Sequence, residues 1–467
     1  MITSDNKTIL KFSERNLAVL VFSLFFSWLL AIPFEGQTLY LLLAHYNIDF
    51  SDYIFKSIAA HLAGLISCSF YVKNMKSAKL LVIVSIAVCI AGTSSFFLKP
   101  SLLWDVSLVI SSFAAGASVS AWAFYFKELT ETNERIKMAA DGLIFSNILM
   151  IFINVVSANV SVYAGLIVSV ILLIAGFIFA FKLSSICINE KSSMSSGINI
   201  TKTVMLLCIF IIIITINSGL MYQVINPNFS HLEKLVSWYW ALPYITAIII
   251  MRNLSGSKRT YMLYVAIAMM GLGFVSFLVL ESSAMSYILI DTLMLGSFGI
   301  FDLFWWSIIG EMLDYASNPS RLLGVVLSSN VIGVLAGGMT GSFIYNSSDN
   351  KLNASLLALV VVFVILIILP VLHNQLSLLL KNHAYIESVK EKEKKNEKEP
   401  VPLLLQKLTD RERQVAELLL QGRTYKMIAE ELYLSENTVK THIKNIYSKL
   451  NIQSKTDLIK MLNNKID

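Results

Sequence analysis

The stretch LTDRERQVAELLLQGRTYKMIAEELYLSENTVKTHIKNIYSKL, residues 408–450, differs in character from everything before residue 374. It is rich in charged and polar side chains, and its apolar residues recur at helical spacing. The preceding part of the chain consists mainly of apolar runs, many of them close to the roughly 20 residues that a helix needs to cross a bilayer. The chain is therefore predicted to combine a membrane part with a soluble helical module.

The module, residues 403–467, is predicted to contain four short helices. Thr409 and Glu412 have the spacing of a capping box, which opens the first helix. Ser435 is predicted to cap the third helix, and a fourth is expected from about Ser454. The buried stripe of the third helix comprises Val439, Ile443, Ile446 and Leu450, and its opposite face carries Lys440, Thr441, Lys444 and Asn445. A helix pair whose second member offers such a face is typical of a helix-turn-helix unit, although a small helical domain for protein contacts fits the pattern too.

Five short motifs extend this interpretation. The patterns LTxRE, IAxxL, LSxxTVKxH and IxxKL, and the glycine after the first helix, occur in register across nearly the whole module. In this respect the module resembles the LuxR/FixJ-type helix-turn-helix family. The resemblance implies double-stranded promoter DNA as partner and a homodimer formed through the fourth helix. It implies that Lys440, Thr441 and Lys444 enter the major groove, that Ser435 and Thr438 lie near phosphates, and that Lys449 lies close to the DNA backbone. Asn451 replaces the usual glycine after the third helix, which is tolerable because asparagine accepts a left-handed conformation.

The composition places most of the chain in a membrane. Of its 467 residues, 56% are hydrophobic and only 15% are charged, and the mean hydropathy is +0.67. Soluble domains carry about 25% charged residues. The four cysteines form no CxxC pair and no metal-ligand spacing, so the sequence predicts no disulfide framework and no metal or other cofactor.

The expected fold class is all-α: a polytopic bundle of twelve spans in two six-helix halves, followed by the four-helix module. The bundle is assigned to residues 1–373, with halves of about 16–182 and 203–373, and a charged linker to residues 374–402. The predicted spans are 17–43, 53–71, 78–98, 103–126, 138–158, 161–182, 203–225, 234–251, 261–280, 284–309, 322–345 and 353–373.

Loop charge predicts the orientation of the bundle. With the amino terminus in the cytoplasm, the inner connections carry sixteen Lys and Arg residues and the outer ones carry four, as the positive-inside rule requires. The inner residues are Lys7, Lys11, Arg15, Lys73, Lys76, Lys79, Lys127, Arg135, Lys137, Lys182, Lys191, Lys202, Arg252, Lys258, Arg259 and Arg321, and the outer ones are Lys56, Lys99, Lys234 and Lys351. Twelve crossings return the carboxyl terminus to the cytoplasm, so a multi-pass protein of the cell membrane with both termini inside is expected.

A weak internal repeat links the two halves. Gly116, Trp122, Glu128, Ser146 and Asn147 recur, each 183 residues later, as Gly299, Trp305, Glu311, Ser329 and Asn330. Together with the span count and the central polar break, this repeat resembles the two halves of major facilitator transporters. Chance in a biased composition is the alternative. The loop YVKNMKSAK between the second and third spans has the basic residues of the superfamily's motif but neither its glycine nor its aspartate.

Polar groups inside the spans are the candidates for ligand binding, because a charge there is costly and usually faces a cavity or a partner. Glu35 and Gln37 follow Pro33, where the first span is predicted to be interrupted, and Asp302 lies in the tenth span. Trp238 and Tyr239 are further candidates, as are Asp291 and His61. Positions near an interface are the alternative for Glu35 and Asp302. An aromatic belt at the interface is the favoured interpretation for Trp122, Trp305 and Trp306, and Pro243 is expected to kink the eighth span.

The linker and the overall architecture lead to a functional hypothesis. Residues 387–402 contain five Glu and five Lys residues, and they fit either a charged extension of the last span or a flexible tether. No phosphate loop, nucleophile constellation or metal cluster suggests an enzyme. The architecture favours a membrane-bound transcription regulator that senses a small molecule. A transporter with a regulatory DNA-binding tail and a bare membrane anchor for the module are the alternatives.

Overall fold

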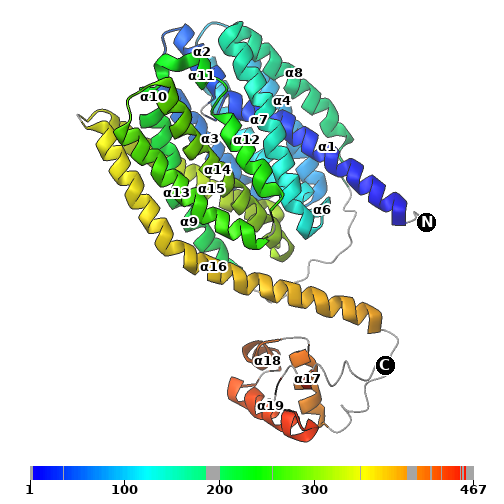
Figure 1. Cartoon of the computed structure of the whole chain (residues 1–467). Helices are drawn as coiled ribbons and strands as arrows, with labels where there is room; N and C mark the ends of the chain where they lie inside the picture. The colour runs from blue at the N-terminus through cyan, green and yellow to red at the C-terminus, as the bar shows by residue number, and fades with distance from the viewer. Residues whose placement is uncertain are drawn as a thin grey trace. The chain divides into compact units, whose positions relative to one another are not determined.

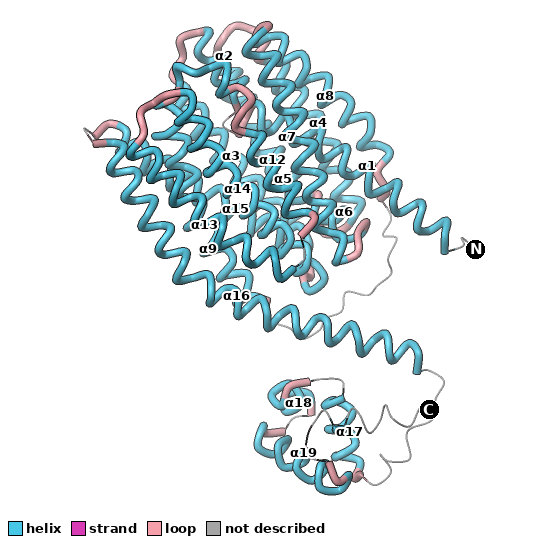
Figure 2. The backbone as a smooth tube through the Cα atoms, in the orientation of Figure 1, coloured by secondary structure: helices cyan, strands magenta, loops and turns pink. Residues whose placement is uncertain are grey.

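The structure is a computed structural model that describes residues 4–34, 36–185, 200–254, 256–347, 349–396, 408–420, 423–432, 434–452, 454 and 457–458. The contacts divide the chain into two compact units, Met1–Leu372 and His373–Asp467. The described residues are almost entirely helical, and no strand occurs among them (Figures 1 and 2).

The first half of the bundle contains α1 (Ser4–Ala31), α2 (Gln37–His45), α3 (Phe50–Tyr71), α4 (Met75–Ser95), α5 (Leu102–Ala121), α6 (Ala123–Glu128), the 3-10 helix η1 (Thr132–Glu134), α7 (Arg135–Asn159) and α8 (Val162–Lys182). The second half contains α9 (Thr201–Leu220), the π-helix η2 (Met221–Ile225), α10 (Asn226–Asn228), η3 (Ser230–Leu232), α11 (Glu233–Val236), α12 (Ala241–Arg252), α13 (Gly256–Val279), α14 (Ala284–Met312), η4 (Leu313–Tyr315), α15 (Pro319–Tyr345) and the start of α16 (Asn350–Asn396).

These helices confirm the polytopic prediction. Within the described residues, 12 helical segments are long and apolar enough to cross a membrane, six on each side of the connection between α8 and α9. The predicted interruption of the first span is confirmed, because α1 ends at Ala31 and α2 begins at Gln37. The expected kink at Pro243 stays a prediction. This proline lies in the first turn of α12, and the eighth span is interrupted just before it, since α11 ends at Val236 and α12 begins at Ala241.

The internal repeat corresponds to repeated packing. A Cβ on Gly116 of α5 would lie 2.1 Å from the carbonyl oxygen of His61 on α3, and one on Gly299 of α14 would lie 2.7 Å from that of Tyr244 on α12. Only glycine permits these close approaches of two helix backbones. The two contacted residues, like the two glycines, are 183 positions apart, so the second and fourth spans of each half pack through equivalent points.

The halves meet along two seams. Helix α15 packs against α3 and α5, and α7 packs against α12 and α14. The first seam therefore joins the second and fourth spans to the eleventh, and the second joins the fifth span to the eighth and tenth. Both seams run beside the central cavity.

The last span does not end where its apolar run ends. Helix α16 extends from Asn350 to Asn396 as one helix of 47 residues with Pro370 inside it. Of the two interpretations of the linker, the helical one therefore applies as far as Asn396, and the rest of the linker lies outside the described residues.

Candidate functional site

The carboxyl-terminal module, residues 403–467, contains three described helices, α17 (Asp410–Leu420), α18 (Tyr425–Glu431) and α19 (Glu436–Leu450). The predicted capping box is present: the backbone N–H of Thr409 donates to Glu412 Oε2 at 2.9 Å, and the N–H of Glu412 donates to Thr409 Oγ1 at 3.4 Å. Ser435 caps α19, accepting from the N–H of Thr438 at 3.1 Å. The predicted stripe of α19 is buried in one core with residues of α17 and α18.

The predicted DNA-contact residues share one helix and its cap. Lys440, Thr441 and Lys444 are exposed on α19, and Ser435 is exposed at its start. Thr438 is half-buried, and its hydroxyl lies 2.7 Å from that of Ser435. The helix therefore presents a short polar and basic face opposite its buried stripe. Contact of these residues with DNA stays a prediction.

Lys449 has a second role that the sequence interpretation did not include. Its Nζ lies 2.6 Å from Glu412 Oε2, and the Glu412 side chain is only 5% exposed. This ammonium, together with the N–H of Thr409, lowers the pKa of Glu412 to about 2. The pair joins the first turn of α17 to the last turn of α19. The predicted contact between Lys449 and DNA would have to coexist with this pair.

The end of α19 agrees with the sequence, and the remainder of the module is only partly described. Asn451 has φ 52° and ψ 48°, the left-handed conformation expected of an asparagine that ends a helix. Leu458 is buried in the module core. Gly422 and most of the predicted fourth helix lie outside the described residues.

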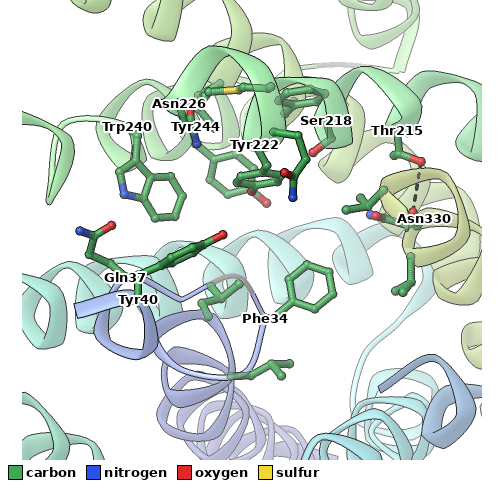
Figure 3. A pocket seen from close by; sticks show the side chains of 18 of the residues that line it. Phe34, Gln37, Tyr40, Thr215, Ser218, Tyr222, Asn226, Trp240, Tyr244 and Asn330 are labelled. Carbon is green, nitrogen blue, oxygen red and sulfur yellow. Dashed lines mark hydrogen bonds between the residues drawn. The ribbon is translucent and has the colours of Figure 1, made fainter. Parts of the chain in front are cut away.

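The membrane unit encloses a cavity of about 1020 Å³ between its two halves. Phe34, Gln37 and Tyr40 line it from the first half, and Tyr222 and Trp240 line it from the second (Figure 3). The lining includes Asp49 before α3 and Phe50 at its start, Asn226 and Ser230 between α9 and α11, and Asn346 after α15. The cavity thus extends to the connections after the first, seventh and eleventh spans, which we call its loop end.

The candidate ligand residues fall into three groups. Gln37 and Asp302 line the cavity, as do Asn147 and Asn330 from the internal repeat. Trp238 and Tyr239 do not line it: Trp238 is 38% exposed, and the Tyr239 hydroxyl lies 2.7 Å from that of Thr292. These two precede α12 in a turn, where helical spacing does not fix the direction of a ring. Trp240 and Tyr244 line the cavity instead, and Glu35 lies outside the described residues.

Asp302 is held by an aromatic hydroxyl. The Tyr244 hydroxyl donates to Asp302 Oδ2 at 2.5 Å, from α12 to α14. The interpretation of Trp122, Trp305 and Trp306 as an interface belt is wrong, because all three are at most 4% exposed. They pack inside the bundle, where Trp122 lies against Phe22 and Trp306. The sequence indicated that these rings lie near one end of a span, but it did not indicate which residues of other helices cover them.

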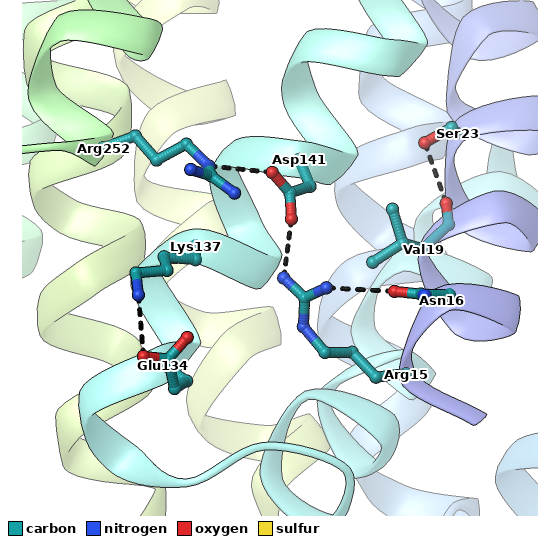
Figure 4. Close-up of polar contacts among 8 residues, drawn as sticks. All are labelled: Arg15, Asn16, Val19, Ser23, Glu134, Lys137, Asp141 and Arg252. Carbon is teal, nitrogen blue, oxygen red and sulfur yellow. Dashed lines mark hydrogen bonds and ion pairs between the residues drawn. The ribbon is translucent and has the colours of Figure 1, made fainter. Parts of the chain in front are cut away.

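The opposite end of the bundle is closed by ion pairs. Asp141 of α7 accepts from Arg15 Nη2 of α1 at 2.6 Å and from Arg252 Nε of α12 at 2.9 Å (Figure 4). The bond to Arg252 joins the two halves. We call this the ion-paired end. The sequence interpretation missed Asp141, although an aspartate near the basic end of an apolar span could have predicted an ion pair there.

A second cross-half cluster lies one to two turns away along α7. Arg135 Nη2 lies 2.7 Å from Asp314 Oδ1, and Thr132 Oγ1 donates to Asp314 Oδ2 at 2.7 Å. Arg135 is only 4% exposed, and its Nη1 also donates to the Gly310 carbonyl at 2.5 Å. Asn318 adds a bond to the Val72 carbonyl at 3.0 Å. The cavity therefore reaches the loop end, while polar contacts tie the halves together at the ion-paired end.

A twelve-span bundle and a helix-turn-helix unit on one chain define a membrane protein with a DNA-binding module. Residues 406–462 match the family described as bacterial regulatory proteins, luxR family. The module is similar to the spore germination protein GerE of Bacillus subtilis (strain 168), with 48% identity over 52 residues, 11% of this chain and 70% of GerE. Through this module the chain belongs to the luxR family of bacterial regulatory proteins. It is also similar to the regulatory protein LiaR of the same strain, with 49% identity over 49 residues, but these are 10% of this chain and only 23% of LiaR.

The bundle has the fold of major facilitator transporters. It is similar to a bacterial homologue of the iron transporter ferroportin in an outward-facing state, with a TM-score of 0.58 and 12% identity over 78% of this chain and 99% of that one. It is also similar to the transporter FucP in an outward conformation, with a TM-score of 0.55 and 13% identity over 76% of this chain and 98% of FucP. At this identity the likeness concerns the fold.

Proposed function

We propose that this protein is a membrane-bound transcription regulator that senses a small molecule in the cavity of its bundle and binds promoter DNA with its carboxyl-terminal module. The observation that carries the proposal is a luxR-family module on the same chain as a complete transporter-like bundle with a central cavity. Such a chain joins a ligand pocket to a DNA reader with no intermediate protein.

The proposed topology places both termini in the cytoplasm of the cell membrane. The loop charges support it, since the ion-paired end carries Arg15, Lys76, Arg135, Arg252 and Arg321. In this orientation the loop end faces outward, and the cavity takes up its ligand from outside the cell. The state described here is then outward-facing, because its cavity extends to the loop end.

The ligand acts through the balance between two bundle conformations. A ligand that binds the outward-facing state more tightly favours it, and only this difference in affinity shifts the equilibrium. Helix α16 joins the last span to the linker without a break, so a change in the last span also moves the start of the linker. This movement alters how readily two modules pair on DNA. Pairing controls binding because one module alone neutralises few phosphates.

On DNA, the exposed face of α19 reads the major groove. Lys440, Thr441 and Lys444 contact base edges, and Ser435 and Thr438 lie near phosphates at the start of the helix. This assignment rests on their shared face and on the family match. Two modules bind as a homodimer and read two half-sites together.

Promoter occupancy in cells tests the proposal directly. Immunoprecipitation of the full chain with bound DNA should recover specific promoters, and a Lys444→Ala variant should lose them. A Glu417→Ala variant, altered at an exposed position of α17 away from the reading face, should keep them. Occupancy that stays constant across a broad metabolite screen would count against sensing. Intact regulation after residues 1–373 are replaced by one unrelated span would favour the bare anchor.

A transporter with a DNA-binding tail is the second candidate. The complete twelve-span fold and an acidic residue in the cavity, Asp302, favour it. Uptake of a cavity ligand into proteoliposomes that is lost in Asp302→Asn would support it. A regulator without transport should bind the ligand and show no uptake.

A further inference from the structure

We propose that the cavity binds a small organic cation that also carries a hydrogen-bonding group. This inference rests on the proposed function only in assuming that the cavity is where a ligand binds. It names the chemical class of that ligand.

The charged side chains that line the cavity are acidic. Among the described residues, the lining of the cavity includes the carboxyl groups of Asp302 and Asp49 but no Lys or Arg. Within the described residues, Asp302 forms no ion pair, and its contact is the hydrogen bond from Tyr244. Two arginines of the ion-paired end, Arg15 and Arg252, are already bound to Asp141. A carboxylate inside a bundle is costly unless a positive charge approaches it, so the cavity favours a cation and disfavours an anion.

The aromatic lining points to the same class. Phe34 and Tyr40 from the first half lie across the cavity from Tyr222 and Trp240 of the second half (Figure 3). Aromatic faces attract ammonium groups, and tryptophan does so most strongly. Because these rings come from both halves, a cation between them contacts both. Such a ligand would favour the arrangement in which the rings face one another.

Two buried polar atoms indicate that the ligand carries more than a charge. Within the part of the chain that the structure describes, the Nε1 of Trp305 and the Nδ1 of His61 have no hydrogen-bond partner, although both residues line the cavity and are 1% and 5% exposed. Leaving such groups unpaired is unfavourable. The indole N–H needs an acceptor, and the amide side chains of Asn147 and Asn330 also line the cavity. A cation that carries a hydroxyl or carbonyl group would satisfy this set.

A neutral polyol is the competing ligand, because amides and aromatic rings also suit hydroxyl groups. The two classes differ in their need for the carboxylate. Binding should therefore be measured with probes that differ only in charge: phenylpropylamine, phenylpropanol and phenylpropionate, and choline with its carbon isostere dimethylbutanol. The purified full chain in detergent at neutral pH is titrated with each probe by calorimetry.

The cationic member of each set should bind at least about tenfold more tightly than its neutral or anionic counterpart, since only the cation is attracted by both the Asp302 carboxylate and the aromatic faces. Asp302→Asn should remove this preference, while Asp302→Glu should keep part of it. Glu281→Gln removes a carboxylate between α13 and α14 that is absent from the lining, so it should bind like the unaltered chain. Trp240→Leu should weaken the cations more than the neutral probes.

Three results would overturn the proposal: neutral or anionic probes that bind as tightly as the cations, an Asp302→Asn variant with unchanged cation affinity, and cations that fail to bind at all. The two proposals fail separately. Cation binding without any change in promoter occupancy would contradict the regulatory function and leave the ligand class intact. Promoter occupancy that responds only to a neutral compound would contradict the ligand class and leave the regulatory function intact.

Discussion

Replacing Asp141 by Asn should open the ion-paired end of the bundle. In the structure one carboxylate, 16% exposed, accepts from Arg15 in its own half and from Arg252 in the other. An amide cannot neutralise either arginine, and the two guanidinium groups are left to repel each other. The bond to Arg252 exists only when the halves are together, so its loss weakens the closed state and not the open one.

The size of the effect follows from that single cross-half bond. A hydrogen bond to a charged partner contributes about 1.5–3 kcal/mol. The 30% exposure of Arg252 favours the lower part of this range, because solvent screens the pair. Since about 1.4 kcal/mol changes an equilibrium constant tenfold, the ratio of open to closed ends should rise by about tenfold. The Arg135–Asp314 cluster remains and should prevent complete opening.

Spin labels across this end measure the two populations. Lys76 on α4 and Arg321 on α15 are exposed and belong to different halves, so cysteines at these positions report the separation. Pulsed electron paramagnetic resonance should show a larger long-distance population in Asp141→Asn. The matched control is Glu134→Gln, which removes a carboxylate paired at 2.8 Å with Lys137 in the same half. Equal distance distributions in both variants would refute the reasoning.

Three further predictions concern the module. Because Lys449 lowers the pKa of Glu412 to about 2, below its usual 4.5, this carboxyl stabilises the fold above pH 4.5 and the contribution is lost as pH falls toward 2. Chemical unfolding of residues 403–467 should therefore show about 1–3 kcal/mol of acid-dependent stability, and a Lys449→Met variant should lack it. Lys440→Ala should weaken binding to the preferred duplex by about 1–3 kcal/mol in a gel-shift titration; an equal loss on every duplex would assign Lys440 to phosphates instead of bases. Asn451→Ala should lower the free energy of unfolding by about 1 kcal/mol, since alanine is strained in the left-handed region, whereas Asn451→Gly should not; equal unfolding curves for the two would contradict this.

Much of the fold followed from local pattern. The apolar runs determined which segments form spans, because a bilayer requires a fixed length of apolar helix. The T-x-x-E box, the capping Ser435 and the stripe from Val439 to Leu450 are likewise local, since their partners lie within a few residues. These features could be predicted from the sequence and agree with the structure.

The cavity was predicted less well. Gln37 and Asp302 were found because polar groups are costly in a span, and both line the cavity. Trp238 and Tyr239 were preferred to Trp240 and Tyr244 because the sequence does not show that the helix starts only at Ala241. The three buried tryptophans were assigned to an interface for a similar reason. The sequence shows where each ring lies along its span, but it does not show which residues of other helices cover the ring.

The sequence by itself determined which segments cross the membrane, which end of each carries the basic residues, and that a luxR-type module follows them. These properties depend on length, charge and short-range spacing. Only the tertiary structure decided that Asp141 bridges Arg15 and Arg252, and that Asp302 meets Tyr244 beside a ring-lined cavity. These contacts join residues 58 to 126 positions apart. They form because close packing at glycines brings helices of each half together and the helices α3, α5 and α7 of one half pack against α15, α12 and α14 of the other, a geometry that no local pattern encodes.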